Sequence, residues 1–258
     1  GIRDQPRSRG LGDVYKRQPE DGIAIFNGGN KICLGLAQRT SIKKYIYSLS
    51  EGDFDIFAKE VKVEKDFIEF IAVSKKFGQR KIHLNLLGKH QIENFLGACL
   101  CSLILGVPFE KIEKAAPKIK TPETSLSKKR GKGGVTVIDD SYSQNPDGVM
   151  SALDYLSLYP GKKIIIMPCL IELGDSAPSI HKSIGRKIGE ICDLCIILTP
   201  TFFEEIKLGA KEKGMKEERI VFSQDEKKIA SLLKEYLKKE NVILIEGRVP
   251  EKIKKIVL

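Results

Sequence analysis

The stretch "VTVIDDSYSQNP", residues 135–146, decides the fold of this chain. It begins as a short apolar strand and then presents two carboxylates, three hydroxyls and two amides where that strand ends. Four more apolar runs follow, and amphipathic helical stretches separate them: "KKIIIMPCL", "DLCIILTP", "RIVFS" and "VILIEG". Short apolar strands that alternate with helices are typical of a parallel sheet. We therefore expect a Rossmann-like α/β domain with a mainly parallel sheet.

The polar residues at the end of the first strand indicate a ligand site. In open α/β sheets, ligands meet the loops at the carboxyl ends of the strands. A carboxylate such as Asp140 can accept hydrogen bonds from a ribose diol, and the N-terminus of the following helix can attract phosphate. The alternative is that Asp140 and Ser141 only cap the helix that begins near Asn145.

Composition restricts the classes of function. The chain has 258 residues, of which 41% are hydrophobic and 30% charged, and this balance is typical of a globular protein with a real core. The net charge is +10, but lysines alternate with glutamates, as on solvated helix faces, and no nucleic-acid signature interleaves them with aromatic residues. We expect no nucleic-acid partner. The sequence contains no apolar run of membrane-spanning length and no signal-peptide core, so we expect no membrane insertion and a cytoplasmic location.

The six cysteines lie mostly in apolar runs, so we expect reduced, buried thiols. Cys192 and Cys195 form a C-x-x-C pair, for which a redox or half-zinc role is the alternative to packing.

The N-terminal half has a different organisation. Residues 1–18 lack any helical or strand period and look like a translated adapter or assembly scar, so we expect a fragment that begins near Pro19. Residues 19–120 include the apolar strand "GIAIFNGG", strands of an antiparallel edge within residues 57–86, a helix from Ile92 to Leu105 and a second short helix. We expect a domain boundary near residue 120, with residues 121–258 as the C-terminal domain.

Several of these segments, in the same order, resemble the Mur ligase family. They are "GIAIFNGGN", "GKHQIENFLGACLCSLILGVPFEKI", "IDDSYSQNP", "SALDYL", "IELG" and "IHKSIGR". The chain is most similar to the branch of the family that adds D-alanyl-D-alanine to a UDP-N-acetylmuramoyl tripeptide. The resemblance covers residues from about Pro19 to the C-terminus, with the truncated end of the central ATPase domain followed by the C-terminal domain.

The resemblance implies an ATP-dependent amide ligase of peptidoglycan precursor synthesis. It implies ATP and Mg²⁺ as cofactors of the full-length parent, and UDP-N-acetylmuramoyl peptide and D-alanyl-D-alanine as substrates. The residues that it assigns to the nucleotide are His90 and Asn94 near adenine, Asp140 at the ribose, and Tyr142 and Asn145 along the nucleotide edge. Arg248 is implied in substrate binding, and no catalytic residue is assigned.

The sequence also departs from the family pattern. Gln91 stands in place of asparagine, Gly28 and Gly29 in place of Ala-Asp, and Pro168 and Cys169 in place of Gly-Asp. Ser125 falls near an expected arginine, and Glu246 lies in a stretch that normally reads Lys-Gly-Ser-Arg. No G-x-x-x-x-G-K-[ST] motif occurs, so we expect the chain alone to be inactive without the missing N-terminal parts. The alternatives are a non-catalytic, Mur-like binding or regulatory protein and a folylpolyglutamate- or cyanophycin-type ligase.

Overall fold

The computed structural model describes residues 21–120, 126–142 and 145–258. The described residues divide into two compact units. The N-terminal unit contains the residues up to Lys62, Ile68–Leu84 and His90–Ile119. The C-terminal unit contains Val63–Phe67, Asn85–Lys89 and Lys120–Leu258. The segment interpreted as a scar, residues 1–18, and Ser125 lie outside the described residues.

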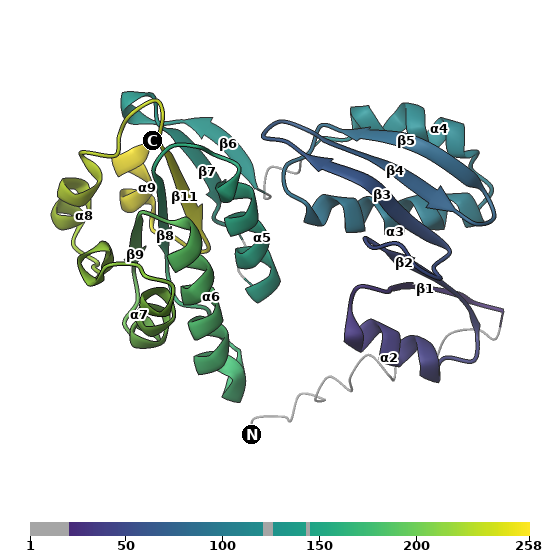
Figure 1. Cartoon of the computed structure of the whole chain (residues 1–258), viewed down its shortest axis with the longest axis horizontal. Coiled ribbons are helices and arrows are strands. Elements are labelled where there is room, and N and C mark those ends of the chain that lie inside the picture. Colours follow the sequence, from purple (N-terminus) through teal and green to yellow (C-terminus); the bar gives the residue numbers. More distant parts are fainter. Residues whose placement is uncertain (1–20, 121–125, 143–144) are drawn as a thin grey trace, which may run out of the picture. The chain divides into compact units, whose positions relative to one another are not determined.

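The N-terminal unit is built on a five-stranded sheet in the order β1-β2-β3-β4-β5 (Figure 1). The strands are β1 (Ile23–Asn27), β2 (Lys43–Ser48), β3 (Ile56–Val63), β4 (Ile68–Ser74) and β5 (Gly78–Leu84). β4 and β5 form the predicted antiparallel hairpin, and Ile68 pairs with Leu84. The parallel pairing of β1 with β2 and of β2 with β3 was not predicted. Alternate residues of β4 are buried, because successive side chains of a strand point to opposite faces.

The described residues of this unit form three α-helices: α2 (Lys31–Arg39), α3 (His90–Ile104) and α4 (Phe109–Ala115). In α3, the buried residues recur at helical spacing, and they are Ile92, Phe95, Leu96, Cys99, Leu100 and Leu103. Gly106 follows with φ 87°, which only glycine adopts at low cost, and Pro108 then prevents the helix from continuing. Both predicted helices are therefore confirmed, and the bounds of the first agree to within two residues at each end.

The C-terminal unit contains a six-stranded sheet in the order β10-β9-β8-β11-β7-β6 (Figure 1). The strands are β6 (Ser127–Arg130), β7 (Thr136–Asp140), β8 (Lys163–Met167), β9 (Leu194–Ile197), β10 (Ile220–Phe222) and β11 (Val242–Glu246). All pairs are parallel except β6 with β7. The expected mainly parallel α/β domain is confirmed.

Helices cover both faces of this sheet. They are α5 (Pro146–Ser157), α6 (Ala177–Ile191), α7 (Phe203–Glu212), α8 (Glu226–Leu233) and α9 (Glu251–Val257). Apolar residues of α5, α6 and α7 pack on one face and those of α8 and α9 on the other. Ile138 and Leu244 point to the α5 face, and Ile243 and Ile245 to the α9 face. By alternation, Asp140 and Glu246 point to the α5 face at the carboxyl ends of neighbouring strands.

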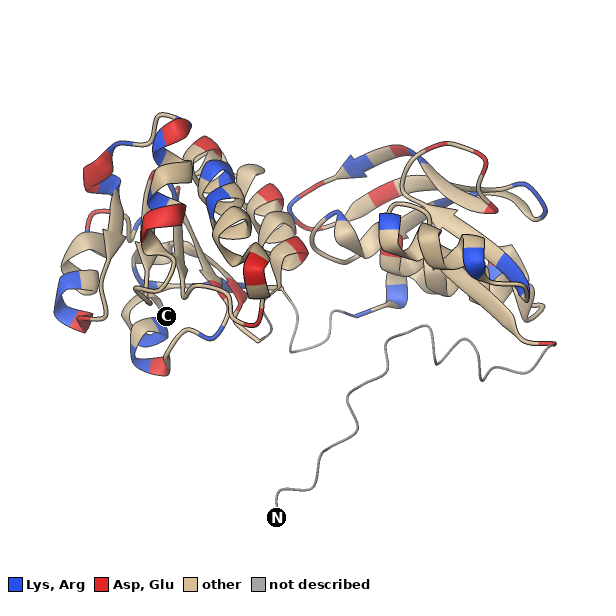
Figure 2. Ribbon diagram, turned by 90° about the horizontal axis from the view of Figure 1, so that it is seen from below, with Lys and Arg blue, Asp and Glu red and all other residues tan. Residues whose placement is uncertain are grey.

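Charged residues of both signs are interspersed over the helices of both units (Figure 2). On α6 and α7, for example, Lys182 and Arg186 both pair with Glu212 at 2.7 Å. This mixture agrees with the prediction of solvated helix faces. Among the helices of the described residues, none combines the length and apolar composition needed to cross a membrane.

The cysteines are free thiols, but they are not all buried as expected. Cys101 is exposed on α3, and Cys33 is only partly buried where it packs against the small cluster of Ala24, Phe26 and Ala37. Cys192 and Cys195 are buried, and burial raises the pKa of both thiols. The described residues contain no cluster of three or more His, Cys, Asp or Glu side chains suited to a metal ion. The burial of Cys192 and Cys195 therefore supports a packing role for the C-x-x-C pair.

Candidate functional site

A pocket of about 590 Å³ lies at the carboxyl ends of the strands of the C-terminal unit. We call it the carboxyl-edge pocket. Its lining follows β7, β8, β9 and β11 and consists of Tyr142, Pro168, Cys169, Ile171, Glu172, Thr199 and Arg248. This volume is within the range of small-molecule sites, and the carboxyl edge is where parallel α/β sheets bind ligands.

The loop after β8 forms one wall of this pocket and is fixed from below by a buried histidine. The Leu170 backbone N–H donates to Nε2 of His181 at 2.9 Å, and Nδ1 of His181 donates to the Ala177 carbonyl at 2.7 Å. The imidazole also stacks on Phe202, with ring centroids 4.4 Å apart. Burial lowers the pKa of His181, which favours the neutral ring that this pair of hydrogen bonds requires. His181 is thus a positioning residue for the loop.

Backbone contacts hold the rest of this wall. The Cys169 N–H donates to Oγ1 of Thr199 at 2.6 Å, which ties the end of β8 to the end of β9. Glu172 has φ 62°, a left-handed conformation that is rare for residues other than glycine. Backbone strain of this kind collects at functional sites.

The pocket contains two side chains of opposite charge, Glu172 and Arg248, and both are exposed. Among residues 21–120, 126–142 and 145–258, neither has an ion-pair partner. They line the same pocket without pairing with one another, so each is available to a ligand. The pocket is therefore suited to a ligand that carries both a positive and a negative group.

Three carboxyl groups gather beside the pocket, at the ends of β7 and β11. Asp139 faces α9 and forms an ion pair with Lys129 at 2.6 Å. Burial raises the pKa of Asp139, but hydrogen bonds from Lys129 and Ser141 outweigh this effect and keep the pKa below its usual value. Asp140 is half-buried, and burial followed by the charge of Asp139 raises its pKa to about 6. Glu246 is paired in register with Asp140 and is fully buried. Burial, followed by the charge of Asp140, raises its pKa well above the usual range.

The helix that follows β7 is capped by Asn145. Its Oδ1 accepts a hydrogen bond from the Gly148 N–H at 2.9 Å. The alternative that Asp140 and Ser141 cap this helix is wrong, because Asn145 occupies the cap position. The Ser141 backbone N–H donates to Oδ1 of Asp139 at 3.3 Å. The Asp140 carboxylate is thereby left without a structural role in the cap.

Comparison with known proteins identifies both halves of the chain. The family model described as "Mur ligase, glutamate ligase domain" matches residues 126–249, and the one described as "Mur ligase middle domain" matches residues 12–102. The chain belongs to the Mur ligase family. The second match begins inside the segment interpreted as a scar, and that interpretation stays a prediction.

Two relatives of this Mur ligase chain carry the same name. UDP-N-acetylmuramoyl-tripeptide--D-alanyl-D-alanine ligase of Escherichia coli is 25% identical over 180 residues, which are 69% of this chain and 40% of the relative. The ligase of the same name from Buchnera aphidicola subsp. Acyrthosiphon pisum is 28% identical over 232 residues, or 84% of this chain and 45% of the relative. The chain therefore spans less than half the length of these relatives.

Solved structures agree on the fold. MurF from Acinetobacter baumannii matches with a TM-score of 0.77 at 21% identity, over 92% of this chain and 51% of that structure. MurF ligase from Thermotoga maritima in complex with ADP matches with a TM-score of 0.75 at 19% identity, over 95% of this chain and 56% of that structure.

The structure brings together some of the residues that the sequence suggested for this Mur ligase and separates others. Tyr142 and Arg248 line the carboxyl-edge pocket, together with Pro168 and Cys169, two of the departures from the family pattern. Asp140 and Asn145 lie at the same edge of the sheet but do not line the pocket. His90 and Asn94 belong to the N-terminal unit, at the start of α3.

At the start of α3, Gln91 connects the two residues expected near adenine. Its Nε2 lies 2.9 Å from Nε2 of His90, and its Oε1 accepts from Nδ2 of Asn94 at 3.3 Å. Nδ1 of His90 is buried and has no hydrogen-bond partner in the described part of the chain. Burial lowers the pKa of His90, so this nitrogen belongs to a neutral ring. Gln91 thus keeps a polar connection where the family has asparagine.

The departure at Gly28 has a packing reason. A Cβ atom at this position would lie 2.7 Å from the Phe54 ring and 2.9 Å from the Ile46 side chain, closer than real Cβ contacts. The alanine that the family has here does not fit without movement of these neighbours.

Sequence reasoning did not identify Glu172 and Thr199 as site residues. Both follow buried strands, and the end of a parallel strand is the signal that would have found them. The positive φ value of Glu172 could not be predicted from the sequence.

Proposed function

We propose that this chain carries part of an ATP-dependent ligase that joins D-alanyl-D-alanine to a UDP-N-acetylmuramoyl tripeptide. The carboxylate of the peptide receives the γ-phosphoryl group of ATP, which leaves ADP and an acyl phosphate. The dipeptide amine then attacks the acyl carbon, an amide bond forms and phosphate departs. The relatives with this name support the proposal, and the observation that carries it is the unpaired Glu172 and Arg248 in one pocket. The cytoplasm, which supplies ATP, is the location we propose.

The dipeptide is a zwitterion, and the two charges of the carboxyl-edge pocket are complementary to it. We assign its carboxylate to Arg248, since a guanidinium binds a carboxylate through two parallel hydrogen bonds. We assign its ammonium group to Glu172. Thr199 and Ile171 supply a hydroxyl and an apolar surface in the same pocket.

The nucleotide roles implied by the family stay proposals. Asp140 fits a ribose contact, because its half-buried carboxylate accepts no hydrogen bond from the described residues and is not needed by the helix cap. Tyr142 is 65% exposed beside it, as a side chain that flanks a ligand would be. Asn145 uses Oδ1 for the cap and keeps its Nδ2 for the nucleotide edge. We propose adenine contacts for His90 and Asn94.

We also propose that the reaction uses Mg²⁺. The residues that the structure describes do not form a three-ligand cluster for it. Mg²⁺ commonly binds through one or two carboxylates together with substrate phosphates. No residue of this chain is therefore assigned to the metal.

The test is the binding of D-alanyl-D-alanine to the whole 258-residue chain, measured by calorimetry. The matched ligands are the N-acetyl dipeptide, which lacks the ammonium group, and the dipeptide amide, which lacks the carboxylate. We expect both to bind about tenfold more weakly than the dipeptide, or about 1.4 kcal/mol each. In Arg248→Gln the preference over the amide should disappear, and in Glu172→Gln the preference over the N-acetyl form should disappear. Equal binding of all three ligands would overturn the assignment.

A second candidate, a non-catalytic Mur-like binding protein, is favoured by one observation. Glu246 is a fully buried carboxyl group in a stretch where the family normally has a lysine. A chimera of the Escherichia coli relative that carries residues 126–258 of this chain as its C-terminal domain separates the two candidates. A ligase domain supports phosphate release that depends on both substrates, whereas a binding-only domain does not. Recovery of activity only in Glu246→Lys would identify this residue as the cause.

A further inference from the structure

We propose that the C-terminal unit has a second ligand site, at the opposite end of its sheet, for a small phosphate-bearing anion. The site is a pocket of about 590 Å³ at the amino ends of β8, β9 and β11, which we call the amino-edge pocket. Its basic lining residues are Lys162, Lys163, Arg219 and Lys238. This proposal does not depend on the ligase function.

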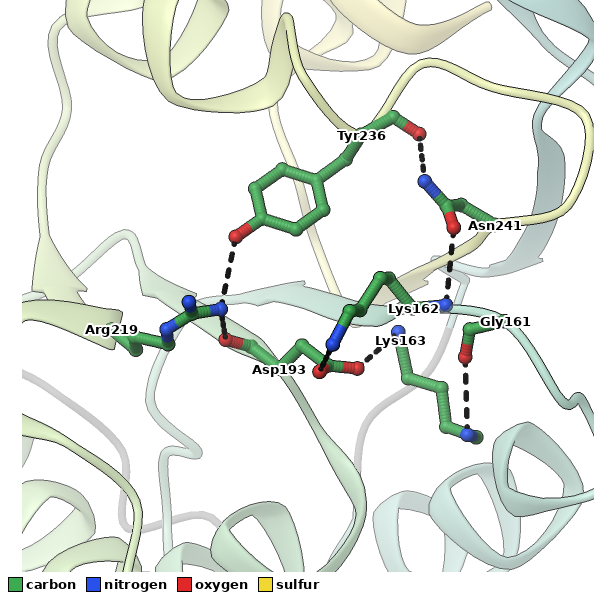
Figure 3. A network of polar contacts seen from close by, with 7 residues as sticks. All are labelled: Gly161, Lys162, Lys163, Asp193, Arg219, Tyr236 and Asn241. Carbon is green, nitrogen blue, oxygen red and sulfur yellow. Dashed lines mark hydrogen bonds and ion pairs between the residues drawn. The ribbon is translucent and has the colours of Figure 1, made fainter.

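The walls of the amino-edge pocket are held in place by a connected set of hydrogen bonds (Figure 3). The Asp193 carboxylate accepts from Nζ of Lys162 at 2.8 Å and from the Lys163 backbone N–H at 2.9 Å. Oδ1 of Asn241 accepts from the Lys162 backbone N–H at 3.1 Å, and its Nδ2 donates to the Tyr236 carbonyl at 3.1 Å. The starts of three strands are thus tied together, and a ligand would meet a site that is already ordered.

Arg219 is the central charge of this pocket. Its Nη1 donates to the Asp193 backbone carbonyl and to the Tyr236 hydroxyl, each at 3.3 Å. Both acceptors are uncharged, and in the described part of the chain no carboxylate pairs with this half-buried guanidinium. Nε and Nη2 keep their N–H groups for another acceptor. A half-buried guanidinium without a carboxylate is complementary to an anionic ligand.

Two lysines add to this charge. Nζ of Lys163 contacts only a neutral acceptor, the Gly161 carbonyl at 3.2 Å, and Lys238 has no ion-pair partner among the described residues. Lys162 is neutralised by Asp193. Glu235 and Glu240 also line the pocket, so the unpaired charges sum to a single excess positive charge.

This charge balance and the volume select the class of ligand. A guanidinium with free N–H groups and adjacent lysines is the usual arrangement for a phosphate group. The two glutamates disfavour an extended polyanion such as a nucleic acid. The cavity exceeds the size of a phosphate ion alone and leaves room for a small phosphorylated molecule. We therefore expect a phosphate monoester to bind more tightly than free phosphate.

The amino-edge pocket is separate from the carboxyl-edge pocket. β8 and β11 have five residues each and begin at one pocket and end at the other. Five residues of strand span roughly 16 Å. A variant in one pocket should therefore leave binding in the other unchanged.

The experiment is a calorimetric titration of the whole chain with glucose 6-phosphate, inorganic phosphate and citrate as separate probes. We expect one site, with the ester at least threefold tighter than phosphate and citrate the weakest. Arg219→Gln should weaken ester binding at least tenfold. Lys163→Gln removes only a contact to a carbonyl and should weaken ester binding several-fold. This variant tests the proposal if Arg219→Gln fails to fold. The matched control is Arg186→Gln, on the surface of α6, which should bind normally.

Four outcomes would overturn the proposal or the class of ligand that it names. The first is that no probe binds saturably. The second is that Arg186→Gln weakens binding as much as Arg219→Gln, which would indicate general attraction to a basic protein. The third is that Arg248→Gln abolishes binding while Arg219→Gln does not, which would place the anion in the carboxyl-edge pocket. Tighter binding of citrate than of the ester would overturn the phosphate class.

Discussion

Glu246 ends β11 with a fully buried carboxyl group, and neither of its oxygens has a hydrogen-bond partner in the described part of the chain. Burial raises its pKa in the folded state, so the folded chain holds a proton that the unfolded chain releases above about pH 4.3. This contribution to stability is fully present below the unfolded pKa and is lost as pH rises toward the folded pKa.

We therefore predict that Glu246→Gln is more stable than the natural chain at pH 8 and similar to it at pH 4. The expected gain at pH 8 is about 1–2 kcal/mol, because the amide does not ionise in the unfolded chain and so gives the unfolded state no advantage as pH rises. Urea unfolding between pH 4 and 8 measures this difference. Exposed Glu240→Gln is the control and should show no such trend. Parallel stability curves for Glu246→Gln and the natural chain would show that Glu246 does not titrate in this range.

Asp140 allows a prediction about nucleotide binding. Its pKa is raised to about 6, so its carboxylate loses charge as pH falls through 6, and with it the ability to accept two hydrogen bonds from a diol. Adenosine should bind less tightly at pH 5 than at pH 8, and its preference over 2′-deoxyadenosine should shrink. In Asp140→Asn, the affinity should be about tenfold lower and independent of pH, with unfolding free energy unchanged or slightly higher.

Ligand-detected NMR titrations of adenosine and 2′-deoxyadenosine test this prediction, because neither ligand ionises between pH 5 and 8. Asn145→Ala is the contrasting variant: it removes the helix cap and should lower stability by about 1 kcal/mol. If Asp140→Asn binds adenosine normally, the ribose assignment fails.

At the scale of single residues, the sequence predicted the position of Asp140 and Tyr142 at the end of a strand, because one short stretch contains both the strand and these residues. It did not predict Glu172 or the burial of Glu246. The first depends on a left-handed backbone conformation, and the second on the register between two strands about 100 residues apart. Neither property is local in the sequence.

Among the elements, α6 and α7 pack so closely that glycine is required. A Cβ atom on Gly185 would overlap the carbonyl oxygen of Ile206, and one on Gly209 would overlap the carbonyl oxygen of Lys182. These carbonyl oxygens belong to the backbone of a helix, which cannot move aside as a flexible side chain can. The pair of helices in turn carries His181 and Phe202, which support the pocket loop.

We predict that Gly185→Ala lowers the unfolding free energy by about 1–3 kcal/mol, although alanine is the better helix former. Gly148→Ala is the matched control in the same unit. Its Cβ would meet Asn145 at 3.4 Å, an ordinary contact, so stability should change by less than about 1 kcal/mol. Chemical denaturation measures both variants. A Gly185→Ala protein as stable as the natural chain would mean that α6 and α7 can separate freely.

The elements that the sequence predicted are those with a clear hydrophobic period. β7, β8, β9, β11 and helices α5 to α8 follow directly from it. β6 was not predicted, because three of its four residues ("SKKR") are exposed and the strand forms only by pairing with β7. α9 has only seven residues, too few to display a period.

At the scale of the whole molecule, the chain divides into two compact units, each with a sheet of its own. In the C-terminal unit, helices cover both faces of the sheet and both hydrophobic clusters are large. Both units leave some large apolar side chains exposed, among them Ile32 at 72% and Leu105 at 78% in the N-terminal unit and Ile171 at 69% in the C-terminal unit. We propose the domain boundary near residue 120 on this basis, and the prediction of an independent C-terminal domain follows from it.

We predict that a protein of residues 120–258 unfolds cooperatively on its own, whereas one of residues 21–120 associates through its exposed apolar surface. The C-terminal unit also includes Val63–Phe67, where the Lys65 carbonyl accepts from the Tyr155 hydroxyl at 2.6 Å. The shorter protein lacks this acceptor, so Tyr155→Phe should cost about 1 kcal/mol in the whole chain and close to nothing in residues 120–258. Circular dichroism with urea denaturation measures both. An unfolded 120–258 protein beside a soluble, cooperative 21–120 protein would show that the boundary is wrong, and equal costs of Tyr155→Phe would show that the Lys65 contact does not stabilise the fold.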